Sequence, residues 1–222
     1  SKKKFEVSII DTIGEFIMNR TTRQVVERQI TGLQNVLDYI ETPEYKAFCI
    51  SLSETLRNKG RIFISGVGKN ANIATKISES MASLGVRSGY ISPTNYLHGD
   101  AGYIEAFDVV IHISRSGKTD EMHAMANHLY ATRPHIQQYL IHCNEKLVDV
   151  FTNPFTKIHY IPNVKEGDHL ETAPNTSTTV FLCLLDSITA HLSESLGFTK
   201  ENFLAYHPGG NLGNSLKEEL NV

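Results

Sequence analysis

A short run of hydroxyl residues around a glycine, residues 114–119 (SRSGKT), is the part of the chain best suited to binding a phosphate. It follows the apolar run Val109-Val110-Ile111, which is typical of a buried strand, and it precedes a helical pattern that starts at Asp120. A turn of this kind points backbone N–H groups and the positive end of a helix dipole at a ligand bound beyond the carboxyl end of the strand. The hydroxyls can donate to phosphate oxygens. An ordinary strand-to-helix turn with a serine cap fits the same residues, so the segment by itself leaves both interpretations open.

A second glycine-containing turn, residues 66–71 (GVGKNA), follows the expected strand at 61–65. Its spacing is that of a dinucleotide-binding turn, which also needs an acidic residue about twenty positions later, at the end of the next strand. Residues 91–94 (ISPT) stand there instead, with no carboxylate. A Walker phosphate loop is excluded because Asn70 takes the place of the magnesium-binding hydroxyl after Lys69. Two interpretations remain: a close backbone approach to a small phosphate or sugar with Lys69 as a fixed cation, or a tight turn with an exposed lysine.

The composition limits the classes of partner and the compartment. With 222 residues, of which 41% are hydrophobic, the chain can bury a full core as one large domain or as a domain with an arm. A net charge of -3, with both signs spread along the chain, argues against a nucleic-acid partner and a polybasic membrane patch. No apolar run reaches the length of a membrane span, and no signal-peptide segment follows the N-terminal lysines. Cys49, Cys143 and Cys183 lie far apart in apolar settings, so we expect reduced core residues in a cytoplasmic protein.

Hydrophobic periodicity predicts a helical N-terminal arm and then alternating strands and helices. The arm covers residues 1–58, packs on the domain or on a partner subunit, and contains a helix start at Thr42-Pro43-Glu44. Residues 59–222 form the main domain, with strands expected at 61–65, 86–91, from 109, from 137 and at 157–161. Helices are expected at 73–84, from 120 and at 174–196, with a short one closing the tail. This alternation predicts a five-stranded parallel sheet in a three-layer αβα sandwich, whose ligands bind at the carboxyl ends of the strands.

Further motifs fall in the loops at that end, and together they resemble a known family. They are Gly66-x-Gly68-Lys69, Ser92-Pro93 with His98-Gly99-Asp100, Ser114-x-Ser116-Gly117-x-Thr119-x-Glu121, Val164-Lys165-Glu166, residues 173–179 (APNTSTT) and His207-Pro208-Gly209-Gly210-x-Leu212-Gly213. The set resembles sugar isomerase (SIS) domains, which have a flavodoxin-like fold, and among them the arabinose-5-phosphate isomerases. Such proteins often continue into a pair of CBS domains, so a chain that ends soon after Leu220 resembles a short form without them. Arg115 and Lys118 depart from the Asn and Glu that are common in this turn.

The resemblance implies an isomerase that interconverts D-ribulose 5-phosphate and D-arabinose 5-phosphate through an enediol, feeding Kdo synthesis for lipopolysaccharide or capsule. This reaction removes a proton beside a carbonyl and returns it to the neighbouring carbon, and it needs no redox cofactor. The implied catalytic residues are Lys69 for the oxyanion, Glu121 to hold Lys69 or a sugar hydroxyl, Glu166 for the proton transfer and His207 for ring opening. The expected substrate-binding residues are those that surround the phosphate and the sugar: Ser65, Gly66, Gly68, His98, Ser114, Ser116, Gly117 and Thr119.

Simpler roles exist for single residues, such as a first-turn helix acid for Glu121 and a structural role for His207. The histidines lack metal-ligand spacing, so we expect no metal and no other cofactor. Two other functions stay open: a non-catalytic phosphosugar sensor, which would need neither Glu166 nor His207, and an isomerase of another phosphosugar or a heptose precursor. The amphipathic arm and the glycine-rich tail favour a homo-oligomer, a tetramer above all, with active sites at the contacts between subunits.

Overall fold

The computed structural model describes residues 20–147 and 154–220 of the chain. The helices within these ranges are α2 (Arg20–Ile40), α3 (Pro43–Arg57), α4 (Lys69–Ser83), α5 (Pro93–Tyr96), α6 (Asp120–Thr132), α7 (Thr176–Ser195), α8 (Lys200–Tyr206) and α9 (Gly210–Leu220), with short 3-10 turns at Asp100–Tyr103 and Glu145–Leu147. The strands are β1 (Ile62–Ser65), β2 (Ser88–Tyr90), β3 (Val109–Ile113), β4 (Gln137–His142) and β5 (Lys157–Tyr160).

The five strands form one parallel sheet in the order β2-β1-β3-β4-β5. The chain runs outward from β1 to β2, then crosses back to β3 on the other side of β1, so the strand order reverses between β1 and β3. In open parallel sheets this reversal creates a crevice at the carboxyl ends of the strands, where ligands bind. The predicted parallel sheet and three-layer fold are confirmed.

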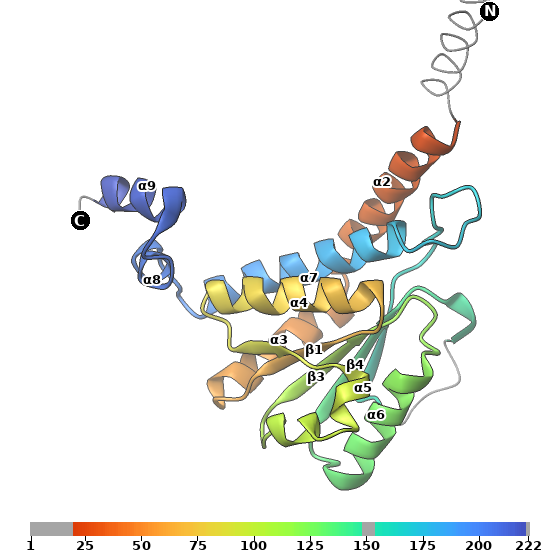
Figure 1. Cartoon of the computed structure of the whole chain (residues 1–222), viewed down its shortest axis with the longest axis horizontal. Helices are drawn as coiled ribbons and strands as arrows, with labels where there is room; N and C mark the ends of the chain where they lie inside the picture. The colour runs from red at the N-terminus through yellow and green to blue at the C-terminus, as the bar shows by residue number, and fades with distance from the viewer. Residues whose placement is uncertain (1–19, 148–153, 221–222) are drawn as a thin grey trace, which may run out of the picture.

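Alternating side chains of the strands divide the core into two layers. Ile62, Ile64 and the odd-numbered residues of β3 pack with α3, α4 and α7, whereas Phe63 and Val110 pack with α5 and α6. Figure 1 shows the same division, with α4 and α7 on one side of the sheet and α5 and α6 on the other. Because both faces are covered, the central strands β1 and β3 are nearly continuous in apolar residues, as the sequence indicated for β3.

The helix α3 begins where the capping residues predict. Thr42 accepts a hydrogen bond from the Tyr45 backbone N–H at 3.2 Å, and Pro43 is the first residue of α3. α3 buries Phe48 and Leu52 in the core, and α2 packs along α7. The predicted arm boundary at residue 58 stays a prediction, and its residues 1–19 lie outside the described part of the chain.

Three details differ from the expectations. The loop at 92–103 contains α5, which begins with a Ser92 cap on the Asn95 N–H. The tail forms two helices, α8 and α9, which extend beyond α7 and away from the sheet (Figure 1). Of the cysteines expected in the core, Cys49 is buried, but Cys143 is half-buried and Cys183 is exposed on α7, because α7 turns only one stripe toward the sheet. No helix in the described ranges is both long and apolar enough to cross a bilayer.

Candidate active site

The hydroxyl turn lies at the carboxyl end of β3, next to the reversal of strand order. The Ser114 and Thr119 hydroxyls are 3.0 Å apart, and the Gly117 N–H donates to the Ser114 hydroxyl at 3.1 Å. Ser116 is exposed, and its hydroxyl accepts from the Lys118 N–H at 3.1 Å. Thr119 occupies the N-cap position of α6 without capping it through its side chain. The first amides of α6 and the hydroxyls of this turn therefore face the same edge, an arrangement that suits an anion.

Two glycines shape the turns at this edge. Gly117 has φ of +67°, and a Cβ there would lie 2.1 Å from a methyl carbon of Leu147, so the turn closes only with glycine. The Gly117 carbonyl is also 2.7 Å from Nε2 of His123, one turn into α6. Gly68 has φ of +62° and is the N-cap of α4. Both predicted glycine turns thus end at helix N-termini on one edge of the sheet.

Glu166 is fully buried beside the N-terminus of α7. Its Oε2 accepts hydrogen bonds from the backbone N–H groups of Asn175 at 2.9 Å, Thr176 at 2.7 Å and Ser177 at 3.3 Å. Its Oε1 accepts from the Ser177 hydroxyl at 2.5 Å and lies 3.2 Å from Nε of Arg115. The carboxylate therefore caps α7 with one oxygen and turns the other toward the hydroxyl turn.

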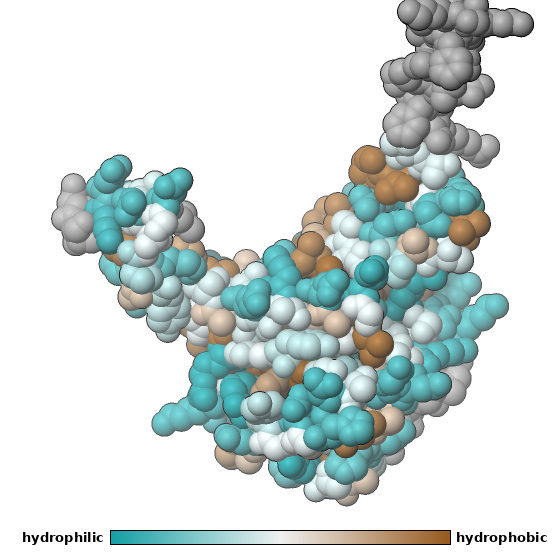
Figure 2. Space-filling model, viewed as in Figure 1, coloured by the Kyte–Doolittle hydropathy of each residue, from teal (hydrophilic) through white to brown (hydrophobic). Residues whose placement is uncertain are grey.

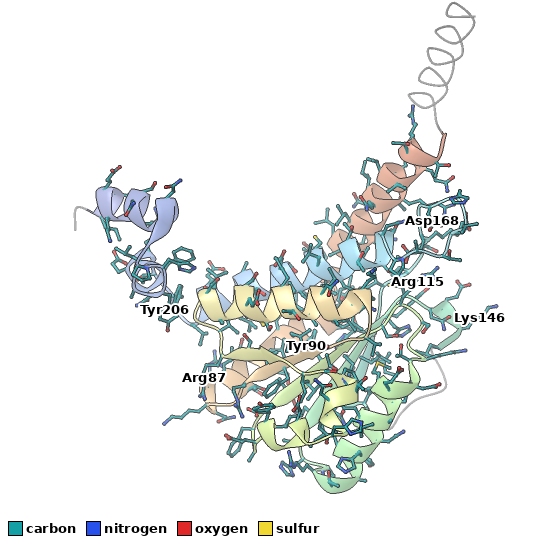
Figure 3. The ribbon with its side chains drawn as sticks, viewed as in Figure 1. Arg87, Tyr90, Arg115, Lys146, Asp168 and Tyr206 are labelled. Carbon is teal, nitrogen blue, oxygen red and sulfur yellow. The ribbon has the colours of Figure 1, made fainter. Side chains whose placement is uncertain are left out.

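A cavity of about 300 Å³ adjoins this ion pair and is lined by Arg115, Ser116, Cys143, Asn144 and Val164. Figure 3 shows Arg115, Lys146 and Asp168 together at this end of the molecule. Asn144 donates to the Ser116 carbonyl at 2.9 Å and so ties the end of β4 to the turn. Burial, with the Glu166 carboxylate adding to it, raises the pKa of the Cys143 thiol to about 12, so it is not a thiolate nucleophile at neutral pH.

Three of the predicted residues lie on exposed parts of the structure. Lys69 is the first residue of α4 and Glu121 the second of α6, and no ion pair joins them in the described ranges. His98 is exposed in the turn after α5. Lys69 and Glu121 therefore stand at the N-termini of the two helices that follow β1 and β3, on either side of the reversal.

Ser65, one of the predicted substrate-binding residues, lies inside the core. It is fully buried, and its hydroxyl contacts Sδ of Met125 on α6 at 3.7 Å. The side chain follows the alternation of β1 into the layer between the sheet and α6. The neighbouring Gly66, also buried, packs against Asn70.

His207 lies at the opposite end of the molecule from Glu166. α7 starts beside Glu166 and has 20 residues, so its far end is about 30 Å away, and α8 with His207 follows that end (Figure 1). His207 stacks on Phe203 at 3.9 Å, and its Nδ1 is 2.9 Å from the Phe203 carbonyl. The tail glycine Gly213 packs on the His207 carbonyl, where a Cβ would lie 2.4 Å away. Within one chain, Glu166 and His207 do not meet.

The residues that sequence reasoning missed as contacts of Glu166 are Arg115 and Ser177. Arg115 stood out only as a departure from the family pattern, and Ser177 only as part of a motif. Their contact with Glu166 depends on the path of a loop, so no local spacing signals it.

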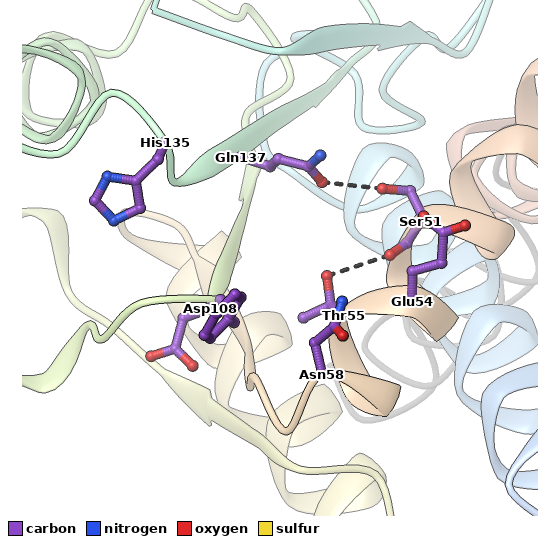
Figure 4. A pocket seen from close by; sticks show the side chains of 8 residues that line it. Ser51, Glu54, Thr55, Asn58, Asp108, His135 and Gln137 are labelled. Atoms are coloured by element: carbon purple, nitrogen blue, oxygen red, sulfur yellow. Dashed lines mark hydrogen bonds between the residues drawn. The ribbon is translucent and has the colours of Figure 1, made fainter.

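A second polar hollow, of about 150 Å³, lies between α3 and the starts of β3 and β4, with Glu54, Asp108 and Gln137 in its lining (Figure 4). It is at the amino ends of the strands, away from every predicted site residue. No cluster of three potential metal ligands occurs among the residues that the structure describes.

Comparison with known proteins assigns the family. The SIS domain family matches residues 55–189, and the chain belongs to it. A Helicobacter pylori protein described as uncharacterized is 35% identical over 90% of this chain and 60% of its own length. The arabinose 5-phosphate isomerase KdsD of Yersinia pestis is 32% identical over 87% of this chain and 57% of its own length. This chain thus spans roughly three-fifths of these relatives. The structure of an E. coli CFT073 protein in complex with arabinose 5-phosphate has a TM-score of 0.70 and 29% identity, and the match covers 86% of this chain and 99% of that one.

Proposed function

We propose that this chain is an aldose–ketose isomerase of phosphosugars that interconverts D-ribulose 5-phosphate and D-arabinose 5-phosphate. The observation that carries the proposal is the ion pair of the buried Glu166 with Arg115, directly beside the hydroxyl turn at the start of α6. Phosphate binding alone would need the turn and no buried carboxylate next to it. The name of the KdsD relative and the sugar-phosphate complex of the E. coli protein support the same substrate class. The product would feed Kdo synthesis for lipopolysaccharide or capsule, in the cytoplasm.

In the proposed reaction the hydroxyl turn and the first amides of α6 hold the phosphate. Oε1 of Glu166 takes the proton from the carbon beside the carbonyl and returns it to the neighbouring carbon, while Oε2 stays on the α7 amides. Arg115, whose side chain is 42% exposed, moves from Oε1 toward the phosphate when substrate enters. Lys69 stabilises the enediolate oxygen, and Glu121 holds Lys69 or a sugar hydroxyl. The step needs no redox cofactor, because the sugar is rearranged without net oxidation or reduction.

His207 completes the site from a second copy of the chain. Within one chain it follows α8, beyond the far end of α7, which is about 30 Å from Glu166, on helices that extend away from the domain. The proposed role is to move protons on the sugar oxygens during ring opening. The active form would be a homo-oligomer, with a tetramer as the expected state.

Incubation of the purified protein, without added metal, with a panel of pentose and hexose phosphates tests the proposal. The expected result is conversion of ribulose 5-phosphate to arabinose 5-phosphate, measured as aldopentose formation, at a higher kcat/KM than for any hexose phosphate. One observation favours the binding-only alternative, because the four donors from residues 175–177 on Glu166 would also suit a purely structural cap. Tight binding of a phosphopentose without turnover, measured by calorimetry, would establish the sensor instead.

A further inference from the structure

The segment that carries Glu166, residues 161–175, is held from two sides. We call it the Glu166 loop. The start of α7 holds the carboxylate, as described above, and Asp168 accepts three N–H groups from within the loop itself. On the other side the loop lies against α2, a helix more than a hundred residues earlier in the chain (Figure 1).

Arg28 on α2 makes the central contact with this loop. One guanidinium nitrogen donates to the Glu166 backbone carbonyl, and the other donates to the Glu171 carboxylate. The Arg28 side chain is only 23% exposed, although it carries a charge. A planar guanidinium can hold two acceptors at a fixed separation, which a single ammonium group cannot do. Arg28 therefore fixes the backbone of the residue whose side chain we assign to proton transfer.

Neighbouring residues of α2 extend the contact along the loop. Gln24 donates to the Gly167 carbonyl at 3.3 Å, and Asn35 donates to the Pro162 carbonyl at 2.8 Å. A Cβ on Gly167 would lie 2.5 Å from the Val25 Cα, so helix and loop touch backbone to backbone. Gln24, Arg28 and Asn35 recur at helical spacing and share one side of α2.

The remaining surface of α2 carries a separate apolar stripe. Val26, Ile30 and Leu37, at the same spacing, are 53%, 61% and 52% exposed. Figure 2 shows hydrophobic surface over this helix. The apolar stripe lies on another side of α2 than Gln24, Arg28 and Asn35, so the polar stripe can be changed without altering it.

We propose that Arg28 is a positioning residue that holds the Glu166 loop, and with it the Glu166 carboxylate, in register with the hydroxyl turn. The expected fall in kcat rests on the proposed isomerase function, whereas the expected effect on the order of the Glu166 loop does not. Arg28 contacts the backbone of Glu166 and not the carboxylate, so its loss shifts the base without removing it. Small displacements of a reacting group lower turnover by about 10- to 100-fold. Substrate affinity depends mainly on the phosphate and the turn at α6, so KM should change by less than about threefold.

The test compares Arg28→Met with two control variants. Arg23→Met removes an arginine of the same helix that is 83% exposed and pairs with Glu27. Glu171→Gln removes the negative charge from the other acceptor of Arg28 and leaves the Glu166 carbonyl contact in place. Arg28→Met should lose amide-exchange protection across residues 161–175 and lower kcat about 10- to 100-fold, and both controls should keep kcat within about threefold of the parent.

Each outcome decides the matter. Unchanged protection of residues 161–175 in Arg28→Met, equal loss in Arg23→Met, or lost protection with parental kcat would overturn the proposal. Should Arg28→Met fail to fold, Arg28→Lys takes its place, because lysine reaches only one of the two acceptors. This variant should lower both kcat and amide-exchange protection, by a smaller amount than Arg28→Met. Parental values of both in Arg28→Lys would overturn the proposal. A parent protein without isomerase activity would refute the proposed function, while the exchange data would still report on the loop.

Discussion

Replacement of Glu166 by Gln separates a catalytic role of this residue from its role as a helix cap. The amide keeps the size of the side chain and one oxygen, which can stay on the amides of Thr176 and its neighbours. The charge, its interaction with the α7 dipole and the pairing with Arg115 are lost. A charge at a helix N-terminus contributes about 0.3–1 kcal/mol, and a partly exposed ion pair about 0–1 kcal/mol. We therefore expect the free energy of unfolding to fall by about 0.3–2 kcal/mol.

Such a loss lowers Tm by about 1–8 °C for a chain of this size and leaves a typical domain almost fully folded at 25 °C. Loss of the proposed general base should instead lower kcat by at least about 100-fold, with KM nearly unchanged. Turnover is measured by ketopentose formation from arabinose 5-phosphate, and stability by thermal unfolding of the same preparations.

Asp168→Asn is the matched control. Its carboxylate accepts backbone N–H groups from Leu170 at 2.9 Å, Thr172 at 3.0 Å and Ala173 at 2.9 Å, within the same loop. This variant loses the charge but keeps one oxygen for these N–H groups, at a position without a proposed chemical role, so kcat should stay within about fivefold of the parent. More than a tenth of parental turnover in Glu166→Gln, or an equal loss in Asp168→Asn, would refute the assignment of Glu166 as the base.

Two further predictions concern the assembly and its response to acid. Suppose that each site takes Glu166 from one copy and His207 from another. Inactive Glu166→Gln and His207→Asn chains, unfolded and refolded together in equal amounts, should then restore about a quarter of parental turnover. A site built from one chain would restore none. Burial lowers the pKa of His112 and His142 to about 4 and that of His159 to about 3, against 6.5 for an ordinary histidine. The unfolded chain then binds more protons below pH 6.5, so each histidine should lower the free energy of unfolding by about 2 kcal/mol between pH 7 and pH 5. Urea midpoints that do not change over this range would contradict the sign.

The local part of this protein is determined by its sequence. The β-branched run of β3, the Thr42 cap before Pro43 and the positive φ of Gly117 in the hydroxyl turn depend on residues a few positions apart. Such interactions depend on spacing along the chain, so the parallel αβα fold and the position of the hydroxyl turn at a strand end could be predicted and are confirmed. The choice of Glu166 as a chemical residue came from its motif, and its role remains a prediction.

Only the tertiary structure decided which groups these residues contact. It placed the Ser65 hydroxyl on Met125, the Glu166 carboxylate on the α7 amides and Arg115, and His207 at the far end of α7. Arg28 reaches the Glu166 carbonyl across 138 positions of sequence. Contacts of this kind follow from how the helices pack on the two faces of the sheet. The burial and direction of one side chain therefore depend on helices and strands that are far away in the sequence, and a local sequence pattern does not include them.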